Sequence, residues 1–467
     1  MDMYSSFWEN EFADLELYDA RISKRLVSLM SSMSSKPGAT CNGMTSEKKK
    51  TKAAYRLIDN PSLDIDEILH IHFEKLVERI GTRNQIYLIE DTSGFNYSHA
   101  GIKGIGSIGG KLTPDKSESR GLFAHTTLAL SDRGEPLGIF DQQIWARKKP
   151  KFSKSELSSI PLNMKSSFRW IKALDREEYL SGSNTKFILL ADREADFCAF
   201  QGTLIDRSID FVIRVRDNRH DVTSGKNLAE LFESMSERKT IKLDVEKRSI
   251  EQKSYRKQIY TKYKKEDQET EFELKYAEVV LKVESVDEIA RTEKLFAVQI
   301  NETRKKPGKK KISWTLLTTL PVQSYEEAIE IIHHYKVRWR IEVFHKTQKS
   351  VCQIENAKFR TGDRLKNYLF LQSLVAFAVF RLKYLLMSAT EEPAANYFEP
   401  SLIEILMKNA STYKAAKIVT VKDFVFMLAN IEGYKTFKLE SPPGIIVLGK
   451  AINSFNLILH GYDMALK

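Results

Sequence analysis

The stretch YKVRWRIEVFHKTQK, residues 335–349, is the most informative part of this chain. It places Tyr335, Arg338, Glu342 and Lys349 at offsets of 3, 7 and 14 residues. At about 100° per helical residue these side chains fall within roughly 60° of arc, so one helix would present them as a single stripe. A mixed-charge stripe is usually a solvated helix face with ordinary ion pairs. It also suits a phosphodiester backbone with a metal ion held midway along it.

Two acidic residues upstream follow short apolar stretches of the kind that form buried strands. Asp91 closes the stretch 86–89 within NQIYLIEDTSGFNYS, and Asp192 closes the stretch 187–190 within TKFILLADREADF. A carboxylate where a strand stops often serves only as a cap or turn residue. The coincidence of two such positions with Glu342 favours a shared functional site.

Three carboxylates on separate elements suggest displacement at phosphorus assisted by two metal ions. Hard cations such as Mg²⁺ prefer oxygen ligands, and a pair of them can bridge the attacking and leaving oxygens. We therefore predict that Asp91, Asp192 and Glu342 hold two Mg²⁺ ions, which Mn²⁺ would replace. Arg338 and Lys349 would neutralise phosphate charge. The histidines near the stripe lack metal-ligand spacing, and we expect them to pack or to contact phosphate: His333, His334 and His345.

The composition agrees with a nucleic-acid partner. Lys and Arg number 73 against 62 Asp and Glu, which gives a formal net charge of +11 and an isoelectric point near 9.2. The basic residues are concentrated in three segments, 46–56, 247–265 and 304–311. Each segment by itself could be a solvated loop, but contact with DNA phosphates accounts for all three together.

A length of 467 residues with 42% hydrophobic content predicts two or three domains. The acidic start is not a secretory signal, and the longest apolar stretch, 368–380, is shorter than the ~20 residues of a membrane span. We expect a buried helix there and no membrane partner. The cysteines show neither a zinc-like spacing nor a disulfide framework, in keeping with a reducing cytoplasm: Cys41, Cys198 and Cys352.

The periodicities predict an α/β fold. Helical patterns occupy about 12–76, interrupted by a Pro- and Gly-containing loop at 34–43, and return after 360. The segments 125–131 and 137–146 read as a hairpin, and alternating segments over 217–312 predict antiparallel strands. We expect three domains in chain order: a helical DNA-binding domain (1–76), a catalytic domain with a β-rich insertion at about 217–312 (77–360), and a helical dimerisation domain (361–467).

The motifs IEDTSGFNYS, ADREADF and YKVRWRIEVFHKTQK resemble the three catalytic blocks of bacterial cut-and-paste DDE transposases. The last block has the spacing of the insertion-sequence-four family, and AAYRLIDNP resembles the transposon-five-type subgroup. The resemblance implies a ribonuclease-H-like (retroviral-integrase-like) core with Asp91, Asp192 and Glu342 as the DDE triad. It also implies a set of residues that contact the transposon end: Tyr335, Arg338, Lys349, Trp314, Arg214 and Arg216.

Trp314, within KISWTLLTTLPV, occupies the place of a family tryptophan that stacks on a base flipped out of the transposon end. An aromatic face can receive an unstacked base, a contact that contributes on the order of 1–3 kcal/mol. The alternative is core packing, which is the commoner fate of a tryptophan in an apolar strand. The resemblance favours stacking.

The resemblance also implies a reaction sequence on the terminal inverted repeats of an insertion sequence. A water nicks one strand, the freed 3′-hydroxyl attacks the opposite strand to give a hairpin, a second water opens it, and the 3′ end joins target DNA. It further implies a homodimer in the synaptic complex, and we expect a cytoplasmic, nucleoid-associated bacterial protein. The alternatives are a catalytically inactive DNA-binding relative that inhibits transposition, and a simple metal-dependent nuclease that does not join strands.

Overall fold

The chain folds into two compact units, which are described here one at a time. The first unit comprises residues 1–187 and 338–467, and the second comprises residues 188–337. The structure is a computed structural model. It describes the following ranges, with only the backbone given for the part of them that lies within 244–268: residues 2–44, 47–98, 101–109, 118–147, 160–176, 184–216, 218–255, 258–287, 289–304, 311–409, 417–434 and 442–466.

An antiparallel sheet forms the centre of the first unit. Strand β3 (Arg120–Ser131) pairs with β1 (Gln85–Asn96), with β4 (Pro136–Trp145) and with the short β2 (Gly106–Ser107). The turn between β3 and β4 is closed by the Ser131 N–H, which donates to the Glu135 carbonyl at 2.9 Å. This confirms the hairpin that the sequence predicts.

Asp91 lies in the middle of β1 rather than at its end. The strand continues for five residues beyond Asp91, because β3 supplies pairing partners as far as Gly121, opposite Asn96. The expectation that the strand stops at Asp91 is therefore wrong. Successive side chains of a strand point to opposite faces, so Asp91 and its neighbour Glu90 lie on opposite faces of the sheet.

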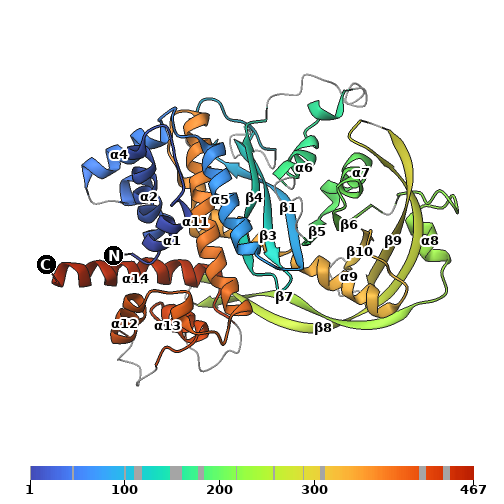
Figure 1. The fold of residues 1–467 in the computed structure, drawn as a ribbon. Helices are drawn as coiled ribbons and strands as arrows, with labels where there is room; N and C mark the ends of the chain where they lie inside the picture. Colours follow the sequence, from blue (N-terminus) through green and yellow to red (C-terminus); the bar gives the residue numbers. More distant parts are fainter. Residues whose placement is uncertain are drawn as a thin grey trace. The chain divides into compact units, whose positions relative to one another are not determined.

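Helices precede and follow this sheet in the first unit. At the N-terminal end, helix α2 begins at its cap Asp19 and stops before Pro37, and Asp64 caps α5. Helices α5 and α11 pack against β4 (Figure 1). The loop expected at 34–43 is shorter than predicted, since Cys41 already begins a helix. The helices are α1 (Ser5–Glu11), α2 (Ala20–Ser35), α3 (Cys41–Met44), α4 (Lys48–Ile58), α5 (Ile65–Ile80), α6 (Phe168–Lys172), α11 (Gly362–Ser388), α12 (Pro400–Asn409), α13 (Val421–Asn430) and α14 (Ile445–Ala465).

Helix α11 is the apolar helix that the sequence predicts. It has 27 residues and, among the described residues, is the one helix that is long and apolar enough to cross a membrane. Its most apolar window is nevertheless 89% buried inside the protein. Phe370 and Phe377 are both fully buried, and Phe377 packs edge-on against His72 of α5. The expectation of a buried core helix over 368–380 is confirmed.

The second unit is built on a mixed sheet. Strand β5 (Lys186–Ala191) runs parallel to β6 (Asp210–Arg214), and α7 (Cys198–Asp206) makes the crossover between them. Strand β10 (Ser313–Thr318) pairs antiparallel with both β6 and β9 (Ala290–Glu302). The sheet then continues through β8 (Gln258–Glu284) to β7 (Lys239–Tyr255), and Figure 1 shows β8 and β9 as long curved strands. The antiparallel insertion and the α/β class are confirmed.

The stretch 335–349 does not form the single helix that its periodicity predicts. Helix α9 (Tyr325–Val337) ends before a turn at Arg338 and Trp339, and α10 (Arg340–Lys346) passes into a π-helical turn, η6 (Thr347–Val351). In the turn the Glu342 N–H donates three residues back to Trp339. In η6 the Cys352 N–H donates five residues back to Thr347. Because the helical pitch changes twice, the uniform stripe is wrong, and π-helical turns of this kind are frequent at functional sites.

Candidate active site

Asp91 and His345 meet on one face of β1. One carboxylate oxygen of Asp91 accepts the N–H of Thr92 at 2.8 Å, and the other lies 3.7 Å from Nδ1 of His345 on α10. Burial of the imidazole, helped by the nearby Lys349 and other cations, lowers the pKa of His345 to about 3. The imidazole is therefore neutral at working pH and adds no positive charge beside Asp91. His345 is thus a buried, packed side chain, which is one of the two roles that the sequence leaves open for it.

The α10–η6 segment runs along the Asp91 face of β1. His345 lies beside Asp91, and four residues later Nζ of Lys349 lies 5.1 Å from the ring centroid of Phe95, itself four residues after Asp91. The helical segment and the strand therefore run in the same direction, side by side, over these residues. The first unit thus brings Lys349, and the helix that carries Glu342, to the face of β1 on which Asp91 lies.

Glu342 forms the ion pair that its spacing allows. Nη2 of Arg338 donates to the Glu342 carboxylate at 2.8 Å. The Arg338 side chain is largely buried, whereas that of Glu342 is 38% exposed. A metal ion that uses Glu342 as a ligand would therefore have to share or replace the Arg338 contact.

Asp192 and its neighbours organise the end of β5 in the second unit. Asp192 caps the 3₁₀ turn η5 (Arg193–Ala195) by accepting the N–H of Glu194 at 2.8 Å. The side chain of Asp196 is buried; its carboxylate accepts the Arg216 N–H at 2.9 Å and pairs with the Arg219 guanidinium at 2.9 Å. The ends of the parallel strands β5 and β6 are thereby joined. Asp196 shares the ADREADF block with Asp192, whereas its partner Arg219 is a supporting residue that motif spacing alone does not reveal.

Three residues that the resemblance assigns to DNA contact gather in the second unit. Trp314 is half-buried, and its ring lies edge-on to that of Tyr335 with centroids 5.3 Å apart. Nη2 of Arg214 donates to the carbonyl of Ser313, next to Trp314, at 2.9 Å. Tyr335 itself is buried, whereas Arg216 is exposed.

The predicted triad is divided between the two units. Asp91 and Glu342 belong to the first unit and Asp192 to the second. Within the described ranges, no three His, Cys, Asp or Glu side chains form a ready metal-binding cluster. The donor chemistry nevertheless fits Mg²⁺, because all three candidates offer carboxylate oxygens, and backbone N–H groups already orient those of Asp91 and Asp192.

Two family models match this chain. Residues 4–63 match a transposase DNA-binding domain, and residues 168–378 match a transposase DDE domain. The chain carries the domains of a DDE transposase. A DDE domain implies a ribonuclease-H-like fold, in agreement with the mixed α/β sheet and flanking helices observed here. The DDE match contains Asp192 and Glu342, whereas Asp91 lies before its first residue.

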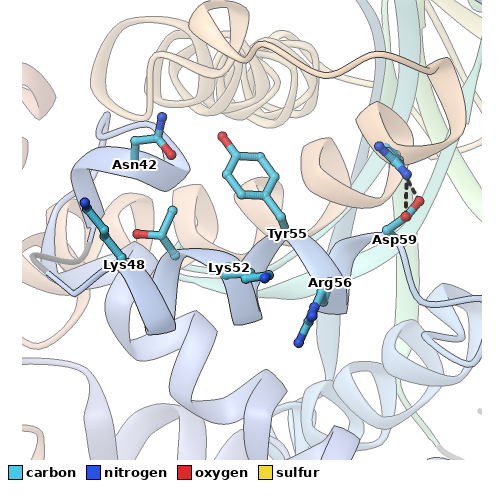
Figure 2. A pocket seen from close by; sticks show the side chains of 8 residues that line it. Asn42, Lys48, Lys52, Tyr55, Arg56 and Asp59 are labelled. Atoms are coloured by element: carbon cyan, nitrogen blue, oxygen red, sulfur yellow. Dashed lines mark hydrogen bonds and ion pairs between the residues drawn. The ribbon is translucent and has the colours of Figure 1, made fainter.

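The transposase DNA-binding domain also supplies most of the lining of a pocket, which the sequence does not predict. The pocket has a volume of about 570 Å³ and lies beside α4 (Figure 2). The basic segment 46–56 falls largely on α4, as expected. Most of the segment 304–311 and the side chains of 247–265 lie outside the described residues. The pocket is lined by Asn42, Lys48, Thr51, Lys52, Tyr55, Arg56, Asp59 and Arg364.

Proposed function

We propose that this protein is a metal-dependent cut-and-paste DNA transposase of an insertion sequence. It would bind terminal inverted repeats, cleave them and transfer their 3′-hydroxyl ends into target DNA. The observation that carries the proposal is the packing of α10–η6 along β1, with His345 beside Asp91 and Lys349 over Phe95, in a chain that also has a transposase DNA-binding domain.

Asp91, Asp192 and Glu342 are the proposed ligands of two Mg²⁺ ions, with Mn²⁺ as a substitute. When bound, such ions make water a stronger nucleophile and neutralise charge on the phosphodiester. The Thr92 N–H orients the Asp91 carboxylate. The neutral His345 closes this side of the carboxylate to solvent without introducing a competing cation.

The DNA contacts divide by chemistry. Arg338 and Lys349 would neutralise phosphate charge near the reacting bond. Trp314 would receive an unstacked base, and Tyr335 would hold the indole in place through their edge-on contact. Arg214 and Arg216, at the end of β6, would contact the DNA backbone.

In the proposed sequence, hydrolysis nicks one strand and the freed 3′-hydroxyl attacks the opposite strand to form a hairpin. A second hydrolysis opens the hairpin, and the resulting 3′-hydroxyl attacks a target phosphodiester. We propose that a homodimer in the bacterial cytoplasm carries out these steps on nucleoid DNA. The segment 361–467 would pair the protomers, the segment 1–76 would recognise the ends, and the segment 77–360 would hold the chemistry.

A cleavage assay tests this proposal. The wild-type protein is incubated with Mg²⁺, a target plasmid and a duplex carrying the repeat that flanks its gene, and the products are resolved on a denaturing gel. We expect hairpin and strand-transfer products. Glu342→Gln keeps the side-chain size and a partner for Arg338 but removes the charge, so it should lower product formation at least 100-fold, the scale of losing one preorganised charge interaction. Glu194→Gln makes the same change at an exposed carboxylate near Asp192 and is the matched control.

Each other outcome supports a different function. Nicks without joined products would indicate a simple nuclease. Specific binding without cleavage would indicate an inactive relative that occupies ends. Full activity of Glu342→Gln would refute the role of Glu342.

A further inference from the structure

The pocket beside α4 is lined from both matched domains. Seven of its eight lining residues lie between positions 42 and 59, within the transposase DNA-binding match. The eighth, Arg364, comes from the first turn of α11 and lies within the DDE match. All eight belong to the first compact unit of the same chain. The pocket is thus a place where the two domains share one surface.

A basic row runs along the α4 side of this pocket. Lys48, Lys52 and Arg56 recur every four residues and so lie along one side of the helix (Figure 2). The row extends about 12 Å at 1.5 Å of rise per residue, longer than a single phosphate group. The opposite side of α4 is apolar, with Leu57 and Ile58 buried. With Arg364 and Asp59 included, the pocket carries four cations and one carboxylate, a balance that suits a polyanion.

Asp59, three residues after Arg56, holds Arg364 beside this row. Nε and Nη2 of Arg364 both donate to the Asp59 carboxylate, a bidentate pair drawn in Figure 2. A guanidinium has five N–H donors in a fixed plane, so this pair orients the group and leaves three donors for another acceptor. Both side chains are partly exposed, at 37% and 46%.

Two further contacts secure the start of α11 against α4. The Asn367 side-chain amide donates to the carbonyl of Ile58 at 3.1 Å, and the ring of Phe359 lies edge-on to Tyr55 with centroids 5.9 Å apart. The contacts between α11 and α4, together with the Asp59 pair, therefore fix the position of the Arg364 side chain.

We propose that Arg364 is a DNA-backbone contact of the end-binding surface, supplied by the DDE domain of the same chain that supplies α4 and oriented by Asp59. The ligand is the phosphodiester backbone of the duplex transposon end. This inference rests on the proposed function, because it assumes that the N-terminal domain binds that end. It adds a residue outside the DNA-binding match.

The contact would connect end binding with the active site. The segment before α11 accepts a hydrogen bond from β1, since the Asn96 N–H donates to the Glu355 carboxylate at 2.7 Å. It also follows η6, which carries Lys349. DNA bound to Arg364 would thus restrain the segment before α11, which contacts β1, the strand that carries Asp91.

Salt dependence of binding provides the test. The affinity for a duplex carrying the terminal repeat is measured by fluorescence anisotropy between 0.05 and 0.2 M salt. Each phosphate contact contributes about 0.9 to the slope of log affinity against log salt, so Arg364→Ala should lower the slope by about 0.9. Over this range wild-type affinity should fall about 3.5-fold more than that of the variant.

Two variants separate charge from structure. Lys366→Ala removes the same charge from the same helical turn, but Lys366 pairs with Asp363 and does not line the pocket, so its slope should equal that of the wild type. Arg364→Lys keeps the charge and should keep the wild-type slope. An equal loss in Arg364→Lys and Arg364→Ala would show a structural role for Arg364 and overturn the inference, as would an equal loss in Lys366→Ala.

The same experiment distinguishes the two proposals. If the wild type does not prefer the terminal repeat over a scrambled duplex, the proposed function fails and this inference fails with it. If the wild type shows that preference and Arg364→Ala has an unchanged slope, only the inference is overturned.

Discussion

The buried contact between Glu11 and α5 predicts how the DNA-binding domain responds to acid. Glu11 ends α1 inside the DNA-binding match, and its carboxylate is almost fully buried against His72 and Arg79 of α5. The N–H of Ile139 donates to Nε2 of His72 at 2.9 Å, so the imidazole proton lies on Nδ1 and is donated to Glu11. Arg79 donates to both Glu11 oxygens, at 2.7 and 3.1 Å.

The magnitude follows from the titration of Glu11. Burial alone would raise its pKa, but Arg79 and His72 lower the pKa from 4.5 to about 2. At about 1.4 kcal/mol per pKa unit, this lowering corresponds to about 3 kcal/mol of stability. Because the folded-state pKa lies below the unfolded one, the contribution is complete above pH 4.5 and is lost as the pH falls toward 2. Roughly half of it should remain at pH 3.

Glu11→Gln should therefore lower the free energy of unfolding by about 3 kcal/mol at pH 7 and by about half as much at pH 3. Hydrogen-exchange mass spectrometry of α1 and α5 peptides measures this local stability at both pH values. Glu78→Gln is the control: Glu78 makes an exposed pair with Lys75, so its loss should cost less than 1 kcal/mol. A cost for Glu11→Gln below 1 kcal/mol at pH 7, or an equal cost at both pH values, would refute the reasoning.

Two further predictions concern the proposed DNA contacts and the proposed active site. Trp314→Ala should weaken binding of a pre-cleaved end by about 5- to 150-fold in an anisotropy assay, from the loss of one stacked base. Trp339→Ala, which removes a tryptophan that is half exposed, should have a smaller effect, and equal effects would contradict the assignment of Trp314. Because burial keeps the His345 pKa at about 3, the pH–rate profiles of wild type and His345→Gln should have the same shape between pH 6 and 9. A limb near pH 6.5 that disappears in the variant would show that His345 titrates there.

Much of the architecture could be predicted from local patterns. The apolar stretch before Asp192, the hairpin of β3 and β4, the antiparallel insertion and the buried helix α11 each follow from hydrophobic periodicity and turn residues. The two domain matches agree with the transposase resemblance of the motifs. Such features depend on residues close together in the chain, so they can be recognised from the sequence without the tertiary structure.

The departures from prediction have tertiary causes. β1 continues past Asp91 because β3 offers pairing partners there, in spite of a Thr-Ser-Gly sequence that favours a turn. The 335–349 stretch is interrupted by a turn at Arg338 and ends in a π-helical turn, although its periodicity favours one helix. In both cases the partner element is distant in sequence, and its packing outweighs a local propensity of a few tenths of a kcal/mol per residue.

The carboxylates proposed for the active site and the basic segment of α4 are properties of the sequence, because chemical identity and helical spacing are local. The surroundings of those groups arise only on folding: a neutral His345 beside Asp91, Asp196 joining the ends of β5 and β6, and Arg364 paired with Asp59 across 305 residues. Burial and charge at a site depend on which distant segments meet there. For that reason the chemistry of this protein can be proposed from its motifs, but the groups that position it are visible only in the folded chain.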